Sequence, residues 1–203
     1  MAKLTKAESW TNRSLLRREK IISSARKSFI ELGFHGTGIA QIAKDATVSA
    51  QQLYRDFSNK EGLVSVVVER ESRALFDPIV DAVESGIADE HALESNLGSV
   101  FETLLDTLEP SLFLEMFAEA ARNPNIALIL QDTDEAVRAR LTKSFRQFAD
   151  VTVPDQDIDV VVQIMLVIMG GLINRPVAEP ALARQTLARQ SASIIAGLLR
   201  KRH

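Results

Sequence analysis

The chain has 203 residues, 46% of them hydrophobic and 25% charged, a composition typical of a soluble globular protein with a sizeable core. It contains no cysteine, which excludes disulfide bonds, thiolate nucleophiles and zinc–thiolate sites and fits a reducing cytosol. The N-terminal segment lacks the apolar core of a signal peptide, and the longest apolar run, residues 158–173, is shorter than the roughly 20 residues that a bilayer requires. We therefore expect a cytoplasmic protein without a membrane partner, in which this run forms a buried helix.

The charge is distributed unevenly along the chain. Residues 1–73 carry 13 Lys or Arg and 8 Asp or Glu, whereas residues 74–203 carry 11 and 19. A basic N-terminal part followed by an acidic C-terminal part is expected if the first part binds a polyanion and the second does not. An excess of this size can also arise by chance, so the charge alone does not decide between the two readings.

The first part of the chain predicts three helices after an arm. Residues 1–16 are expected to be disordered or frayed. The helix that follows has an apolar stripe starting at Ile21 and ends at Gly33, a residue typical of helix C-termini. Residues 39–46 then form a short helix for which Thr37 is placed as the cap, and residues 49–57 form another.

The rest of the chain also has helical periodicity. A longer helix is expected from its cap, Asn59, towards Pro78. Later helices are expected at about 90–108, 111–122, 125–149, 156–174 and 180–201. No segment of strand length alternates between apolar and polar residues. The fold class is therefore all-α, with about nine helices.

The two short helices are joined by a three-residue turn, which is the arrangement of a helix-turn-helix at about residues 38–57. The second of them is polar over most of its surface, and Ser49 is placed to cap it. Such a helix is expected in the major groove of DNA, where a glutamine amide can pair bidentately with adenine. Tyr54 and Arg55 are then expected to contact phosphate or sugar, and the helix starts near Thr37, Ser49 and Lys60 to seat phosphates.

An ordered set of motifs makes a family resemblance specific. In order these are A-x₃-F-x₃-G-[FY] at the first helix end, T-x₄-I-A, V-S, L-Y-x₂-F and S-x-K-E-x-L. Through them residues 18–75 resemble the N-terminal domain of TetR-family transcriptional regulators. The resemblance implies a three-helix DNA-binding domain over residues 17–75 and a larger helical domain for ligand binding and dimerisation over 76–203.

The resemblance also implies roles for individual residues. Thr37, Tyr54 and Lys60 would hold backbone phosphates. The base-reading residues would be Ala50, Gln51, Gln52 and Arg55, with Ala40 and Gln41 assisting. One departure concerns Thr47, which stands in the turn where the family commonly has glycine. A β-branched residue is poorly suited to positive φ, so this turn is expected to be strained or different.

The second half offers parts for a dimer and for a ligand site. The 156–174 helix is apolar nearly all round and the 180–201 helix has an apolar stripe, so both are expected to pair with a second subunit. Gly170 and Gly171 would permit close approach of another backbone. An apolar effector pocket is expected to be lined by Phe101, Leu104, Leu105, Leu108, Phe113, Met116 and Phe117. The alternative is that these residues belong to the ordinary hydrophobic core.

No enzyme site is expected. His35, His91 and His203 are widely spaced and none has a carboxylate at metal-ligand spacing, and the chain lacks a P-loop, a nucleophile elbow and a dinucleotide fingerprint. We expect no metal and no cofactor. The favoured function is a homodimeric repressor that binds a palindromic operator in double-stranded DNA and is released by a small, largely apolar effector. The alternatives are an effector-independent DNA-binding protein and a helical protein-interaction module with a decayed DNA-binding head.

Overall fold

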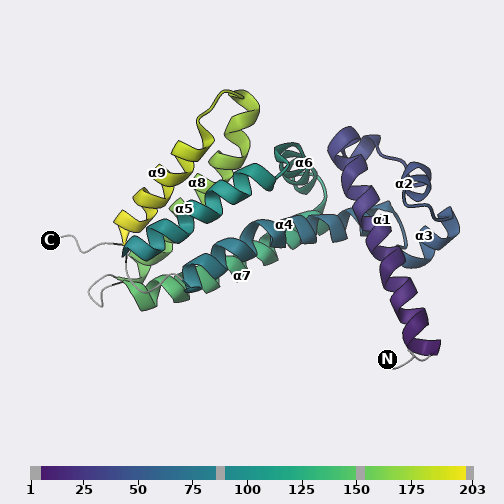
Figure 1. Cartoon of the computed structure of the whole chain (residues 1–203), viewed down its shortest axis with the longest axis horizontal. Helices are drawn as coiled ribbons and strands as arrows, with labels where there is room; N and C mark the ends of the chain where they lie inside the picture. The colour runs from purple at the N-terminus through teal and green to yellow at the C-terminus, as the bar shows by residue number, and fades with distance from the viewer. Residues whose placement is uncertain (1–5, 86–89, 150–153, 200–203) are drawn as a thin grey trace, which may run out of the picture. The chain divides into compact units, whose positions relative to one another are not determined.

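The computed structural model describes residues 6–85, 90–149 and 154–199. These residues form nine helices and no strand, which confirms the all-α fold class (Figure 1). The helices are α1 (Lys6–Gly36), α2 (Ile39–Asp45), α3 (Ala50–Asp56), α4 (Lys60–Ser85), α5 (Glu90–Thr107), α6 (Pro110–Ala120), α7 (Pro124–Phe148), α8 (Asp155–Ala178) and α9 (Arg184–Leu198). The chain divides into two compact units, Met1–Arg70 and Glu71–His203, so the division falls inside α4.

Helix α1 differs from the expectation at its start. The sequence predicts a disordered or frayed arm over residues 1–16, whereas the structure has residues 6–16 in α1. Extending a helix that already exists avoids the cost of nucleation, which allows residues without an apolar stripe to continue it. Residues 1–5 lie outside the described residues.

Gly33 interrupts α1 where the sequence predicts the helix end. Its φ of 72° and ψ of 171° lie in a region that is accessible essentially to glycine alone. Before this point α1 buries Ile21, Ala25 and Phe29, and the Phe29 ring meets Phe34 edge-on with centroids 4.9 Å apart. Gly33 therefore turns the chain so that the segment leading to α2 returns to the core that α1 has started.

Helix α4 is longer than expected because it continues through Pro78 to Ser85. A proline inside a helix removes one hydrogen bond and costs about 3 kcal/mol. The apolar stripe nevertheless continues past it, since Leu75, Ile79 and Val83 are all buried. Burying such side chains stabilises the helix by about 1.5–3 kcal/mol each, which offsets the cost of the proline.

The second unit is a bundle in which α5 packs along α9 and α8 packs on α6, α7 and α9 (Figure 1). Its core contains Phe101 of α5 and Phe145 of α7, both without solvent exposure. Within the described residues α8 is the one helix that is long and apolar enough to cross a membrane, a test that the core helix of a soluble protein also passes. It was expected to be buried, but Val160 and Val167 on one of its faces are exposed.

Candidate nucleic-acid interface

The turn between α2 and α3 is closed by two backbone hydrogen bonds. Thr47 N–H donates to the Lys44 carbonyl at 3.0 Å and Val48 N–H donates to the Ala43 carbonyl at 2.9 Å. This pattern is a Schellman motif, which places the residue after the C-cap at positive φ. That residue is Thr47, with φ of 57°, so the strain expected at this position is present in the structure.

Helix α3 begins with a capping box built from Ser49 and Gln52. Ser49 Oγ accepts a hydrogen bond from Gln52 N–H at 3.1 Å, and Gln52 Oε1 accepts one from Ser49 N–H at 2.9 Å. This reciprocal pairing satisfies two backbone donors that the helix start would otherwise leave free. The Ser49 cap is thus confirmed. The Gln52 oxygen, expected to read an adenine, is instead held against its own backbone.

The exposed face of α3 is polar apart from its alanine. Leu53 and Phe57 are buried and fix the helix to the unit from one side. Four residues on the other side of the helix are exposed. Tyr54 is the largest uncharged one among them, with 53% of its surface exposed. The four are Ala50, Gln51, Tyr54 and Arg55. The structure therefore places these four sequence-predicted residues on one accessible surface.

Two arginines of α1 anchor the C-terminal end of α3. Arg17 donates from Nε and Nη2 to the two carboxylate oxygens of Asp56, at 2.6 and 2.8 Å. Arg18 donates to the Asp56 carbonyl at 2.8 Å, and its guanidinium lies over the Phe57 ring, 4.2 Å from the centroid. The hydrogen bond from Arg17 is the main reason why the pKa of Asp56 lies below its usual value.

Thr37 is placed differently from the expectation. The N-cap of α2 is Gly38, and Thr37 is 1% exposed. Its hydroxyl lies 2.8 Å from the Gly33 carbonyl and 3.0 Å from the Ser28 carbonyl, to which it donates. The buried side chain therefore ties the loop before α2 to the end of α1, and its hydroxyl is not presented to a phosphate.

The remaining sequence-predicted residues lie around α3. Ala40 and Gln41 are exposed on α2, and the Gln41 amide donates to both carboxylate oxygens of Asp45 at 2.9 Å. Lys60 is half-buried at the start of α4, with Nζ 3.4 Å from the His35 carbonyl to which it donates. Asn59 accepts a hydrogen bond from Gly62 N–H at 2.8 Å, which confirms it as the cap of α4.

Sequence reasoning missed the capping box and the arginine anchor. The box was readable, because Ser49 followed three residues later by Gln52 is the usual signature of a helix start. The anchor was not, since nothing local indicates that Arg17 and Asp56 meet across 39 residues of chain.

The predicted effector residues of the second unit are mostly core. Phe101, Leu104, Leu105, Phe113 and Met116 are buried, Leu108 is half-buried, and Phe117 is 57% exposed. Two cavities of this unit lie elsewhere. One of about 630 Å³ lies between α7 and α8, and one of about 330 Å³ lies between α5 and α9. Neither is lined by any of the seven predicted residues.

The predicted dimer helices, α8 and α9, present an exposed apolar face. It consists of Val160, Val167, Val177, Leu187, Ile194 and Leu198, with Val167 the most exposed at 74%. In the part of the chain that the structure describes, a Cβ built on Gly170, Gly171 or Gly197 would meet no atom within 4 Å apart from its neighbouring residues and the nearby backbone of its own helix. Packing inside one chain therefore gives no reason for glycine at these helical positions, where it is unfavourable by about 1 kcal/mol each relative to alanine.

Family models match most of the chain. Residues 21–67 match the bacterial regulatory proteins of the tetR family, and residues 89–200 match the C-terminal domain of BetI-type transcriptional repressors. The chain is similar to the transcriptional regulator UidR of Escherichia coli K12, with 23% identity over 185 residues that cover 90% of this chain and 92% of UidR. It is also 26% identical over 136 residues to BetI of Escherichia coli K12 / DH10B, covering 65% of this chain and 69% of BetI.

Solved structures have the same fold. A TetR-family transcriptional regulator from Mesorhizobium loti superimposes with a TM-score of 0.76 at 22% identity, covering 92% of this chain and 96% of that one. At this identity the likeness supports the fold alone. Together with the matched family models, it places the exposed face of α3 on a scaffold shared with helix-turn-helix regulators.

Proposed function

Because this chain belongs to the TetR family and is therefore a DNA-binding transcriptional regulator, we propose that it is a homodimeric repressor of a palindromic operator, released by a small, largely apolar effector. Regulators of this family bind DNA operators as dimers and also bind small molecules. A cytoplasmic location is part of the proposal, since the operator is there.

The observation that carries the DNA-binding role is the accessible face of α3 on a fixed helix. Gln51, Tyr54 and Arg55 are exposed on it, while Leu53 and the Arg17–Asp56 pair hold the helix from the other side. A reader of base edges needs polar side chains on a well-held helix, and the exposed residues and the contacts of α3 support this role.

We assign the roles on this face as follows. Gln51 and Ala50 read base edges in the major groove, where a glutamine amide can donate and accept at one adenine. Tyr54 and Arg55 contact the DNA backbone, together with Lys60 at the start of α4. Ser49 and Gln52 hold the first turn of α3 through their capping box. Thr37 has an indirect role, because its buried hydroxyl ties the loop before α2 to α1.

The dimer proposal is supported by the exposed apolar face of α8 and α9. Exposed apolar patches of monomeric proteins are usually small, and larger ones mark interaction sites. Another backbone can also approach this face closely, because glycine stands at positions 170, 171 and 197. A two-fold dimer would double the operator, with half-sites about 34–36 Å apart.

The effector proposal rests on the family and on the interior of the second unit. Among the described residues, Ser72 Oγ and Asn174 Oδ1 are buried without a hydrogen-bond partner. Such groups are costly and few in native proteins, which is compatible with a ligand that supplies a donor. The wall proposed from the sequence, which includes Phe101 and Met116, would have to open for such a ligand, because those side chains are buried.

The experiment that tests the function is selection of bound duplexes from a random DNA library by the purified protein at near-physiological salt. A recovered palindrome with half-sites about one helical turn apart would support the dimeric reader. Recovery of an unpaired half-site would contradict the dimer, and recovery of unrelated sequences would contradict sequence-specific reading by α3.

A further inference from the structure

Helix α4 holds an unusual position among the helices of the second unit. The closely packed pairs there are α5 with α9, α6 with α7, α6 with α8, α7 with α8, and α8 with α9, and α4 takes part in none of them. Where helix axes are not in close contact, the position of one helix depends on its longer side chains. The contacts made by its side chains, both the buried apolar ones and the charged ones, therefore hold this part of α4 in place.

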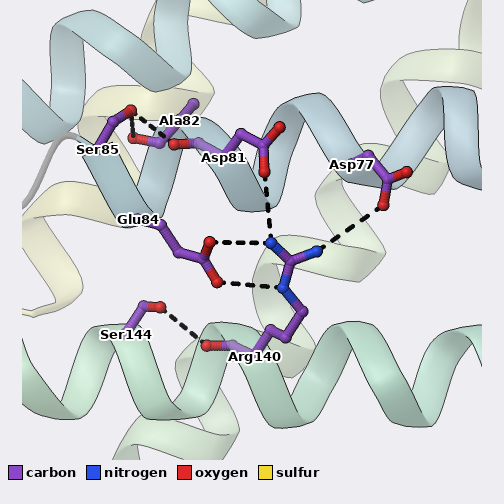
Figure 2. Close-up of polar contacts among 7 residues, drawn as sticks. All are labelled: Asp77, Asp81, Ala82, Glu84, Ser85, Arg140 and Ser144. Atoms are coloured by element: carbon purple, nitrogen blue, oxygen red, sulfur yellow. Dashed lines mark hydrogen bonds and ion pairs between the residues drawn. The ribbon is translucent and has the colours of Figure 1, made fainter.

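A row of carboxylates on α4 meets a single guanidinium on α7. Asp77, Asp81 and Glu84 follow at helical spacing, and Figure 2 shows all three directed at Arg140. Arg140 donates from Nε and Nη2 to the two oxygens of Glu84, at 3.1 and 2.9 Å. Its Nη2 also donates to Asp81 at 3.3 Å, and Nη1 lies 3.8 Å from Asp77.

This cluster is stronger than an ordinary surface ion pair. Isolated exposed pairs contribute little, whereas bidentate geometry and several charges on one partner contribute more. The hydrogen bond from Arg140 holds the pKa of Glu84 below its usual value, and the pKa of Arg140 is raised chiefly by Glu84. This guanidinium thus links α4 to α7, in addition to the burial of Leu75, Ile79 and Val83 on α4.

The same helix belongs to the DNA-binding unit. Its first half buries Leu63, Val67 and Val68 in that unit, and Arg70 is bound to Glu19 of α1, with Nη1 2.6 Å from the glutamate. Helix α4 runs from Lys60 to Ser85 and so belongs in part to each of the two units. We propose that Arg140 is a positioning residue for operator binding, which clamps Asp77, Asp81 and Glu84 and so sets where α4 carries the DNA-binding unit.

This inference rests on the proposed function, since it concerns binding to an operator. Its consequence is that a ligand or substitution that shifts α7 would act on DNA binding through Arg140. Arg138 provides a matched control, because it is also an arginine of α7 but pairs with Asp134 of the same helix, at 2.8 Å.

The absence of cysteine from the chain allows a direct measurement of position. Ser23 of α1 and Ser99 of α5 are exposed, and Ser23→Cys with Ser99→Cys would carry two spin labels, one in each unit. Diluting labelled chains with excess unlabelled chains leaves only the distance within one chain. That distance is measured in otherwise wild-type protein and in Arg140→Gln, Arg140→Lys and Arg138→Gln backgrounds, with operator affinity measured in parallel.

We expect Arg140→Gln to broaden or shift the distance distribution and to weaken binding to the selected operator by about threefold to thirtyfold. Arg138→Gln should leave both unchanged. The exchange Arg140→Glu with Glu84→Arg should recover part of the affinity that Arg140→Glu alone removes, because it restores an ion pair between α4 and α7.

Three outcomes would overturn the inference. The first is an unchanged distance between the two spin labels in folded Arg140→Gln. The second is a loss of operator affinity that is fully explained by the loss of folded protein in unfolding curves. The third is that Glu84→Arg recovers none of the affinity lost in Arg140→Glu. If Arg140→Gln does not fold, Arg140→Lys tests the same point, because it keeps the charge and loses the bidentate geometry. Failure of the wild type to bind any operator would contradict the proposed function instead, and the distance measurement would still test the clamp.

Discussion

At the scale of single residues, the DNA-binding unit is held by side chains that cannot face DNA. Thr37 is buried, and the oxygen of Gln52 is used by its own helix. The residues left free to contact a duplex are fewer than the motif suggested, and Gln51 is the glutamine among them. Substitutions on α3 should therefore separate into those that change specificity and those that change the stability of the helix.

The two neighbouring glutamines provide that separation. Gln51→Ala should cost about 1–3 kcal/mol at one base pair and relax the preference there. Gln52→Ala should instead remove half of the capping box, destabilise α3 by about 1 kcal/mol and weaken all duplexes alike. Competition binding against single-base operator variants distinguishes the two effects. A loss at one base pair in Gln52→Ala would show that its amide does reach the bases.

Substitution of Thr47 by glycine is expected to stabilise the protein. A non-glycine residue in the left-handed region costs about 1–2 kcal/mol, so Thr47→Gly should raise the free energy of unfolding by about 1 kcal/mol after the greater entropy of the unfolded glycine is counted. Urea unfolding followed by circular dichroism measures it. Thr47→Ala is the control, because it removes the β-branch but keeps the Cβ strain and should gain less. A destabilised Thr47→Gly would mean that the threonine side chain contributes more than its strain costs.

The Arg17–Asp56 pair predicts a dependence of stability on pH. The pKa of Asp56 is lower in the folded protein than in the unfolded chain, so its contribution is fully present above the unfolded value and is lost as pH falls through the folded value. Asp56→Asn should be destabilised by about 1–3 kcal/mol at neutral pH. The difference from wild type should shrink in acid below the usual aspartate range. Unfolding curves across that range measure it, and a constant difference would contradict the assignment.

At the scale of elements, α8 has apolar residues on two of its faces. One face of α8 buries Met165, Met169 and Leu172 in its own chain, while Val160 and Val167 remain exposed. A helix with apolar residues on both faces needs cover on both. The sequence indicated this need, but it could not separate the face for the chain's own core from the face that we propose for a second subunit.

Charge on the exposed face should break the dimer. Val167→Glu would bury an unpaired carboxylate at the centre of the proposed interface and should shift the protein to monomer in sedimentation at micromolar concentration. Gln131→Glu is the matched control, since Gln131 is also exposed but lies on α7, outside the proposed interface. A Val167→Glu protein that stays dimeric, or a wild type that sediments as a monomer, would contradict the assignment of α8.

At the scale of the whole molecule, the sequence predicted the fold class and most helices, because their apolar periodicity is local information. It placed the helix-turn-helix for the same reason, whereas the strain at Thr47 was expected from the resemblance to a family that commonly has glycine there. It ended α4 near Pro78, since the cost of a proline is visible in the sequence whereas the burial of Ile79 and Val83 that outweighs it is not. The pairs Arg17–Asp56 and Arg140–Glu84 also depend on tertiary packing between distant segments and had no local signal.

The uneven charge of the chain predicts how binding responds to salt. The basic first part should release counterions from the duplex, so the logarithm of affinity should fall linearly with the logarithm of salt concentration. Substituting a residue that neutralises a phosphate, such as Arg55→Gln, should make that slope shallower by about one. Gln51→Ala should leave the slope unchanged. Equal slopes for wild type and Arg55→Gln would mean that Arg55 does not contact the DNA backbone.

The capping box of α3 has a practical consequence for redesigning operator preference. Randomising the whole exposed helix would produce mostly variants that lose the first turn, because Ser49 and Gln52 secure it together. A library should keep Ser49, restrict position 52 to Gln or Glu, and vary Ala50, Gln51 and Arg55. The side chain that looks most like a reader in the sequence is thus the one that an engineer should leave alone.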